Sequence, residues 1–199
     1  MKDRLITIAD IALRFGRVNR ATFHHDGERP ESDTDHTVML GLLAIEIAWN
    51  HPELGLSIYK LGTLALVHDL AEVFAGDTNT VGGLTEQQRA DKATREAAAI
   101  AGLRVEIGGG ITEAIDNYEA QACRESRFIR YIDKITPKLT HYLNGGAAIR
   151  MMGRDADWLA AAHRKQGAEL AAKYPEFAPV LGPLFDAACA ASEAALRAS

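Results

Sequence analysis

The segment from Leu61 to Asp77, LGTLALVHDLAEVFAGD, restricts what this chain can fold into more than any other stretch. Its first seven residues are almost all apolar and helix-forming, and His68, Asp69 and Glu72 follow them. On a helix, His68 and Glu72 continue the apolar stripe, because steps of three and four residues return to the same face. A buried carboxylate must be paired or protonated. A divalent cation would offset this cost; the alternative is a hydrogen-bonded core histidine with Asp69 at a helix end.

The rest of the chain favours an all-α protein. The whole chain has 199 residues, of which 47% are hydrophobic, and this is enough for one domain with a continuous core. No run alternates with period two over a length that would indicate a sheet. We therefore expect a single domain over residues 1–199, with a core at about 13–143 and C-terminal helices at 154–197 packed on it.

Charge and cysteine content narrow the class of partner and the compartment. The net charge is −5, whereas a protein that binds nucleic acid polymers usually shows a basic face. The two cysteines, Cys123 and Cys189, indicate free thiols in a reducing compartment. The N-terminus lacks the pattern of a secretory signal, and no apolar stretch matches a membrane span. We expect a cytoplasmic protein with no membrane partner.

Periodicity and breaker residues place the elements. Asp33 or Asp35 is expected to cap the second helix, and Pro137 to kink a later one by freeing the carbonyl of Asp133. A long polar loop is expected at 16–34 and a flexible link at 81–84. Helices are expected at residues 3–15, 35–49, 57–74, 86–101, 111–121, 124–143, 154–173 and 176–197.

The polar loop carries three arginines, Arg17, Arg20 and Arg29. Long loops in compact domains are often functional, and a guanidinium can bind a phosphate through two parallel hydrogen bonds. The alternative is that these arginines are solvated surface charges. Asp77, which follows Gly76, is either a turn-forming residue or folds back over the end of the preceding helix.

The ordered pattern His36, His68-Asp69 and Asp133 resembles the signature of the HD superfamily of metal-dependent phosphohydrolases. More closely, it is similar to the branch that contains the 5′-deoxyribonucleotidases. The resemblance runs from Leu13 to about Leu139. Its other matching pieces are Asn19-Arg20, Arg29-Pro30-Glu31-Ser32, Asp35, Leu70-Ala71-Glu72, Gly76-Asp77, Tyr118-Glu119 and Lys134.

This resemblance implies an HD-type helical bundle with one divalent metal ion. Its expected ligands are His36, His68, Asp69 and Asp133. Such a set, with positions open for water and a phosphate oxygen, suits Mn, Co, Fe or Mg better than a closed zinc site.

The resemblance also implies roles for residues around the metal. Glu72 and Asp77 would orient or deprotonate the attacking water and handle the leaving group. Arg20, by its position, would bind the phosphate, with Arg17 and Arg29 as further candidates. The chain departs from the branch at Ala21-Thr22, where an aromatic residue is expected near the sugar or base.

The expected function is hydrolysis of a small phosphomonoester, most plausibly a (deoxy)nucleoside 5′-monophosphate, by a homodimer. Dinuclear relatives need further histidines between Asp69 and Asp133, and this chain has none there. Two alternatives stay open. One is an alarmone (guanosine polyphosphate) hydrolase, which the Val73 after Glu72 disfavours. The other is a non-catalytic HD scaffold that binds a nucleotide.

Overall fold

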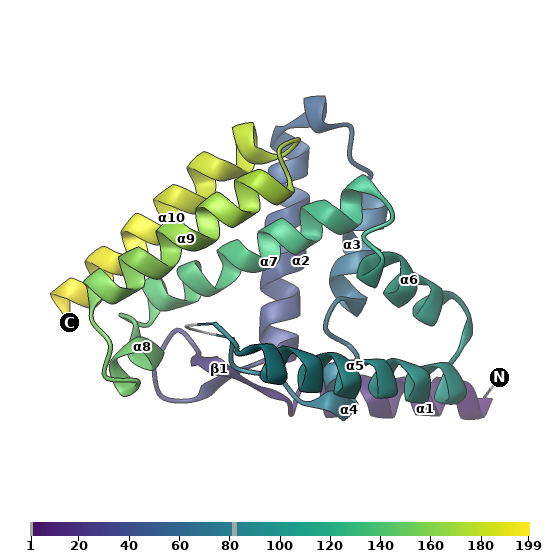
Figure 1. Ribbon diagram of the computed structural model, residues 1–199. Coiled ribbons are helices and arrows are strands. Elements are labelled where there is room, and N and C mark those ends of the chain that lie inside the picture. The colour runs from purple at the N-terminus through teal and green to yellow at the C-terminus, as the bar shows by residue number, and fades with distance from the viewer. Residues whose placement is uncertain (1, 81–82) are drawn as a thin grey trace.

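The computed structural model describes residues 2–80 and 83–199, so residues 81–82 of the expected link at 81–84 lie outside the described residues. The all-α prediction is confirmed, since helices form nearly all of the regular structure (Figure 1). The elements are α1 (Lys2–Phe15), β1 (Asn19–Phe23), β2 (Pro30–Ser32), α2 (Asp33–Asn50), a short 3₁₀ helix (Pro52–Leu54), α3 (Ile58–Val67), α4 (Glu72–Ala75), α5 (Glu86–Glu106), α6 (Gly109–Glu119), α7 (Arg124–Leu143), α8 (Ala147–Met151), α9 (Ala156–Lys173) and α10 (Ala178–Ala198).

The main core forms where α2, α3 and α7 pack together and α9 and α10 cover α7 (Figure 1). Leu40, Leu61 and Ile132 are fully buried there, one from each of the three central helices. A second core lies between α1, α3, α5 and α6 around Leu103 and Ile115. The central helices α2, α3 and α7 are thus fixed by apolar burial, which is the dominant favourable term in folding. Within the described ranges, no helix combines the length and the apolar composition that a membrane crossing requires.

The expected loop at 16–34 instead contains a two-stranded antiparallel ribbon. β1 pairs with β2, with Asn19 opposite Ser32 and Phe23 opposite Pro30, and the register is irregular between these ends. Both strands are short and polar, and one begins with a proline, so they lack the alternating pattern that would predict a strand. The ribbon leads directly into α2 and contacts α7 and α8.

The expected helix at 57–74 is interrupted at the residues with which the sequence analysis began. α3 ends at Val67, residues 68–71 form turns, and α4 covers only Glu72 to Ala75. His68 Nδ1 lies 2.7 Å from the carbonyl oxygen of Ala65, and so caps one of the carbonyls that a helix leaves without a partner at its C-terminal end. The prediction of one continuous helix was wrong, because the His68 side chain donates a hydrogen bond to this carbonyl and the backbone leaves the helical path there.

Pro137 lies inside α7, as expected. The carbonyl that it deprives of a backbone donor belongs to Asp133, and Thr136 Oγ1 donates a hydrogen bond to this oxygen over 2.9 Å. The helix therefore runs from Arg124 to Leu143 with Asp133 in its middle. The expected helix at 86–101 extends to Glu106, and α8 was not expected at all.

Candidate metal centre

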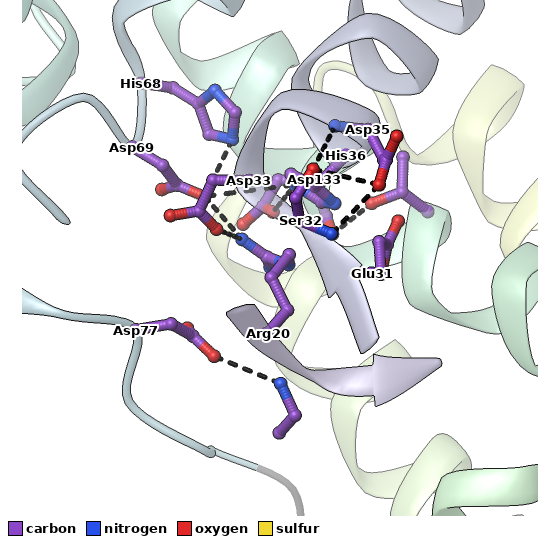
Figure 2. Close-up of polar contacts among 12 residues, drawn as sticks. Arg20, Glu31, Ser32, Asp33, Asp35, His36, His68, Asp69, Asp77 and Asp133 are labelled. Carbon is purple, nitrogen blue, oxygen red and sulfur yellow. Dashed lines mark hydrogen bonds and ion pairs between the residues drawn. The ribbon is translucent and has the colours of Figure 1, made fainter. Parts of the chain in front are cut away.

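The four expected metal ligands come together from three separate regions of the chain. His36 lies in the first turn of α2, His68 and Asp69 directly follow α3, and Asp133 lies in the middle of α7. One potential ligand atom from each residue lies within 4.8 Å of all the others. Figure 2 shows the four side chains pointing toward a common point. Residues up to 97 positions apart in sequence thus form one site.

The individual distances define a compact cluster. His36 Nε2 lies 3.1 Å from Asp133 Oδ1 and 3.9 Å from Asp69 Oδ2. His68 Nε2 lies 3.0 Å from the same Asp69 oxygen. Both imidazole side chains are fully buried, whereas the Asp69 side chain keeps 18% of its exposure. The cluster is therefore reached from solvent on the Asp69 side.

The donor set fits a divalent cation. His68 donates its Nδ1 proton to Ala65, which leaves the lone pair of Nε2 for a ligand. This Nε2 is buried and has no hydrogen-bond partner, although an Asp69 oxygen lies close to it. A buried nitrogen and a carboxylate oxygen 3.0 Å apart can share either a proton or a divalent cation.

The protonation states of His36, Asp69 and Asp133 agree with this assignment, whereas His68 would have to lose a proton to bind a cation. Burial lowers the pKa of His36, so its imidazole is neutral and can be a ligand. Burial alone would raise the pKa values of Asp69 and Asp133, but neighbouring groups outweigh it. His68 and Arg20 lower the pKa of Asp69. Lys134 and His36 lower the pKa of Asp133. Both pKa values are lowered as a result, and both carboxylates stay ionised. Burial lowers the pKa of His68, yet the charges of Asp69 and Asp133 raise it overall.

Arg20 is placed beside the four ligands, as the resemblance implied. Its Nη1 donates to Asp69 Oδ2 over 2.8 Å and to Asp33 Oδ1 over 3.1 Å (Figure 2). Burial disfavours the charged guanidinium, but the charges of Asp69, Asp133, Asp77 and Asp33 raise its pKa overall. Arg20 therefore neutralises carboxylates next to the cluster. Whether it also binds a substrate phosphate remains a prediction.

Asp33 lies in the site, although it was expected only as a candidate N-cap of the second helix. The actual N-cap of α2 is Ser32, which forms a capping box with Asp35, and Asp33 is fully buried against Arg20. Burial raises the pKa of Asp33 to about 6. The signal that could have found it is spacing, since Asp33 precedes His36 by three residues on the same helical face.

Glu72 lies in the same group of carboxylates as Asp33 and Asp69, with one oxygen from each within 4.8 Å of the others. It is buried, and its Oε2 has no hydrogen-bond partner. Burial and the charges of Asp69 and Asp33 raise the pKa of Glu72 to about 10. Glu72 thus holds a proton at neutral pH in the absence of a cation, and a nearby divalent cation would lower this pKa.

Asp77 is brought toward the site by the turn after α4. Gly76 has a φ of 72°, a left-handed conformation that favours glycine, and Asp77 follows it. Asp77 Oδ2 accepts a hydrogen bond from the backbone N–H of Ala21 over 3.2 Å. The chain therefore folds back after α4 and ties Asp77 to the residue next to Arg20 (Figure 2).

The two other arginines lie outside this cluster. Arg17 is exposed just after the end of α1. Arg29 is exposed and pairs with Asp35 over 2.8 Å, so its guanidinium supports the capping box of α2. A positively charged side chain that was not expected in the site is Lys134. Its Nζ lies 2.8 Å from Asp133 Oδ2.

Two histidines and two aspartates that converge on one point in a helical protein, with an arginine beside them, are typical of metal-binding α-helical domains. The chain belongs to the HD domain family, whose model matches residues 13–177.

Curated relatives are similar over part of the chain. A 5′-deoxynucleotidase HDDC2 of Danio rerio is 25% identical over 138 residues, which cover 67% of this chain and 66% of the relative. The Homo sapiens protein of the same name is 27% identical over 110 residues, covering 54% of this chain and 51% of the relative. The chain thus matches between half and two thirds of the length of these relatives.

Two solved structures share the fold. The crystal structure of a predicted metal-dependent phosphohydrolase from Magnetospirillum magnetotacticum MS-1 superposes with a TM-score of 0.66 at 21% identity, covering 98% of this chain and 96% of that one. A conserved hypothetical protein from Pyrococcus furiosus gives a TM-score of 0.55 at 22% identity, covering 69% of this chain and 80% of that one. Both likenesses concern the fold.

Proposed function

We propose that this protein is a metal-dependent phosphohydrolase that removes phosphate from a deoxyribonucleoside 5′-monophosphate. The observation that carries the proposal is the convergence of His36, His68, Asp69 and Asp133 on one point with Arg20 beside them. The name 5′-deoxynucleotidase of the relatives supports the substrate class.

His36, His68, Asp69 and Asp133 would hold one divalent cation. When bound, such a cation neutralises charge that develops on the phosphoryl oxygens and lowers the pKa of water. Mn, Co, Fe or Mg would suit a mixed nitrogen and oxygen set with open positions. Arg20 occupies the space between Asp33 and Asp69, and its charge there favours one cation in the centre over two.

Arg20 would bind the substrate phosphate. Both of its ion pairs use Nη1, so a phosphate would be bound through Nε and Nη2, the other donors of the guanidinium. Binding in this way would hold the phosphorus next to the cluster while Nη1 keeps its contacts with Asp33 and Asp69. Arg17 and Arg29 remain secondary candidates, because neither lies against the cluster.

Glu72 and Asp77 would handle protons during hydrolysis. Glu72 has an unpartnered carboxyl oxygen beside Asp69, where it could exchange a proton with the attacking water. Asp77 lies on the other side of Arg20 in Figure 2, next to Ala21, where it could serve the leaving oxygen of the sugar. Ala21 and Thr22 are small residues where an aromatic residue is expected, so the sugar would have to be recognised by other side chains.

The test is phosphate release from a panel of monoesters by the purified chain with Mn²⁺, Co²⁺ and Mg²⁺ in turn. The panel contains deoxyribonucleoside 5′-monophosphates, their 3′-isomers, ribonucleoside 5′-monophosphates and a guanosine polyphosphate. The proposal expects fastest release from the deoxyribonucleoside 5′-monophosphates. Preference for the polyphosphate would identify an alarmone hydrolase, and nucleotide binding without release would identify a scaffold.

The predicted homodimer and cytoplasmic location remain predictions. Light scattering of the purified protein would test the first, and fractionation of cells that express the chain would test the second.

A further inference from the structure

A second group of metal-ligating side chains lies at the turn between β1 and β2. His24, His25 and Asp26 are consecutive, and one potential ligand atom from each lies within 4.8 Å of the others. His24 Nδ1 lies 2.7 Å from His25 Nδ1 and 3.5 Å from Asp26 Oδ2. The group shares no residue with the HD centre, and nothing in the proposed hydrolysis uses it.

The backbone holds these three side chains in place. The His24 N–H donates to the carbonyl of Arg29 over 2.8 Å, and the Gly27 N–H donates to the carbonyl of His24 over 2.8 Å. The Glu28 N–H donates to Asp26 Oδ1 over 2.9 Å, which fixes the carboxylate and leaves Oδ2 toward His24. The turn is therefore ordered by its own hydrogen bonds, and a cation would find its ligands already arranged.

The turn is also anchored to the helical core. Asn144, at the C-terminal end of α7, donates its Nδ2 to the carbonyl of Phe23 over 2.7 Å. Gly27 has a φ of 72°, and a side chain there would contact Ala147 of α8. These contacts hold the end of β1 against α7 and α8.

The chemistry of the group favours a cation. Two imidazole nitrogens 2.7 Å apart have room for only one proton between them, so at least one lone pair faces the neighbouring ring. The hydrogen bond from Glu28 lowers the pKa of Asp26, so its carboxylate is ionised. Two imidazoles and one carboxylate are borderline ligands that suit Zn, Ni, Cu or Co and leave positions open for water.

We propose that His24, His25 and Asp26 bind a second divalent transition-metal ion, separate from the HD centre. His25 and Asp26 are exposed and His24 is partly exposed, so the ion can exchange with solvent. A cation here would tie together the turn that joins β1, which carries Arg20, to β2. The site uses only residues of the turn, so this proposal does not depend on the proposed hydrolytic function.

The test is equilibrium dialysis of the metal-stripped full chain against Co²⁺, an ion that suits both donor sets, followed by elemental analysis. The wild type should bind two ions per chain. Asp69→Ala should lose the HD ion and keep one, whereas His25→Ala should keep the HD ion and weaken the second site. We expect a loss of affinity of at least about 10- to 100-fold at that site, since changes even outside the ligand set typically cost this much.

Two further variants keep the test decisive. Asp26→Asn keeps the oxygen that accepts from Glu28, so the turn should stay folded while the charged ligand is lost. His51→Ala is the matched control, because His51 is a partly exposed histidine with Nδ1 2.8 Å from Glu53, outside both sites. Two ions per chain in His25→Ala or Asp26→Asn, or no ion in Asp69→Ala, would overturn the proposal.

Discussion

Arg20 is the residue on which the charge balance of the centre depends. It contributes one positive charge among Asp33, Asp69, Asp77 and Asp133, and it directly contacts two of them. A resident cation and a substrate phosphate would both enter this field. Removing Arg20 should therefore affect the two ligands in opposite directions.

Arg20→Ala should raise KM for the substrate by about 10- to 100-fold, because a charge-assisted hydrogen bond to phosphate contributes about 1.5–3 kcal/mol. The same change should leave the affinity for the divalent cation equal or higher, because a neighbouring positive charge is lost. Steady-state kinetics and elemental analysis of one preparation measure both effects. Arg17→Ala is the control with an exposed arginine. Unchanged kinetics in Arg20→Ala would assign the phosphate-binding role to Arg17 or Arg29 instead.

Glu72→Gln should keep the fold and the bound metal and lower kcat by about 10²–10⁴-fold, the usual contribution of a positioned acid or base. Glutamine keeps the shape of this buried side chain but cannot exchange a proton. The readouts are kcat at saturating substrate, metal content and the unfolding midpoint. Near-normal kcat with full metal content would mean that Glu72 is only a packing residue.

The cost of polar residues at apolar positions drew attention to His68 and Glu72, but the full set of expected ligands came from the resemblance to the HD superfamily. Neither indicated what surrounds these residues. Asp33 was not identifiable, because an aspartate at the start of a helix also fits a cap. Lys134 was only a matching residue of the resemblance with no expected role, although it pairs with the buried carboxylate of Asp133.

At the scale of elements, the junction between β2 and α2 positions one of the four expected ligands, His36, together with Asp33. Ser32 ends the ribbon and caps α2, which places Asp33 and His36 in the first helical turn. The apolar periodicity of α2 and α7 predicted these helices well. The ribbon and the break after Val67 could not be predicted in this way, because polar pairing and a side-chain cap leave no periodic signal.

Ser32→Ala should lower the free energy of unfolding by about 0.5–2 kcal/mol, the usual cost of losing an N-cap, and should also lower kcat/KM. The second effect follows because the cap fixes the turn that carries His36. Thr85→Ala is the matched control, since Thr85 caps α5 with a similar capping box that is remote in sequence from the centre. Chemical unfolding and kinetics of both variants test the idea, which fails if both variants keep full kcat/KM.

At the scale of the whole molecule, α7 joins the HD centre to the C-terminal helices. One side of α7 supplies Asp133 to the centre, and its later turns bury Lys138 and His141 near His163 of α9. Lys138 also lies over the ring of Phe185 in α10. The C-terminal helices were expected to pack on the core, whereas no sequence pattern indicated this buried basic cluster.

His141 should make the fold less stable in mild acid. Burial, assisted by the nearby Lys138 and His163, lowers its pKa from 6.5 to about 4. Between these values the unfolded chain binds a proton that the folded chain does not, so stability falls as the pH drops from 6.5 toward 4. The contribution of His141 to the free energy of unfolding should fall by about 2 kcal/mol between pH 7.5 and pH 5.0, whereas the raised carboxyl pKa values of Asp33 and Glu72 act in the opposite direction.

Urea unfolding of wild type and His141→Gln at these two pH values measures this contribution as the difference between their two pH dependences. His51→Gln, which removes a partly exposed histidine outside this cluster, is the matched control. An equally steep pH dependence in wild type and His141→Gln would assign the effect to other groups.

The central claim is that the His36, His68, Asp69 and Asp133 cluster is the metal centre of a phosphohydrolase. The most direct test measures phosphate release from a deoxyribonucleoside 5′-monophosphate and bound Mn²⁺ in the same samples of wild type and Asp69→Ala, after chelation and re-addition of Mn²⁺. We predict that the wild type regains one ion at this centre together with its activity, and that Asp69→Ala regains neither. Full activity in Asp69→Ala, or a metal-loaded wild type that releases no phosphate, would contradict the account.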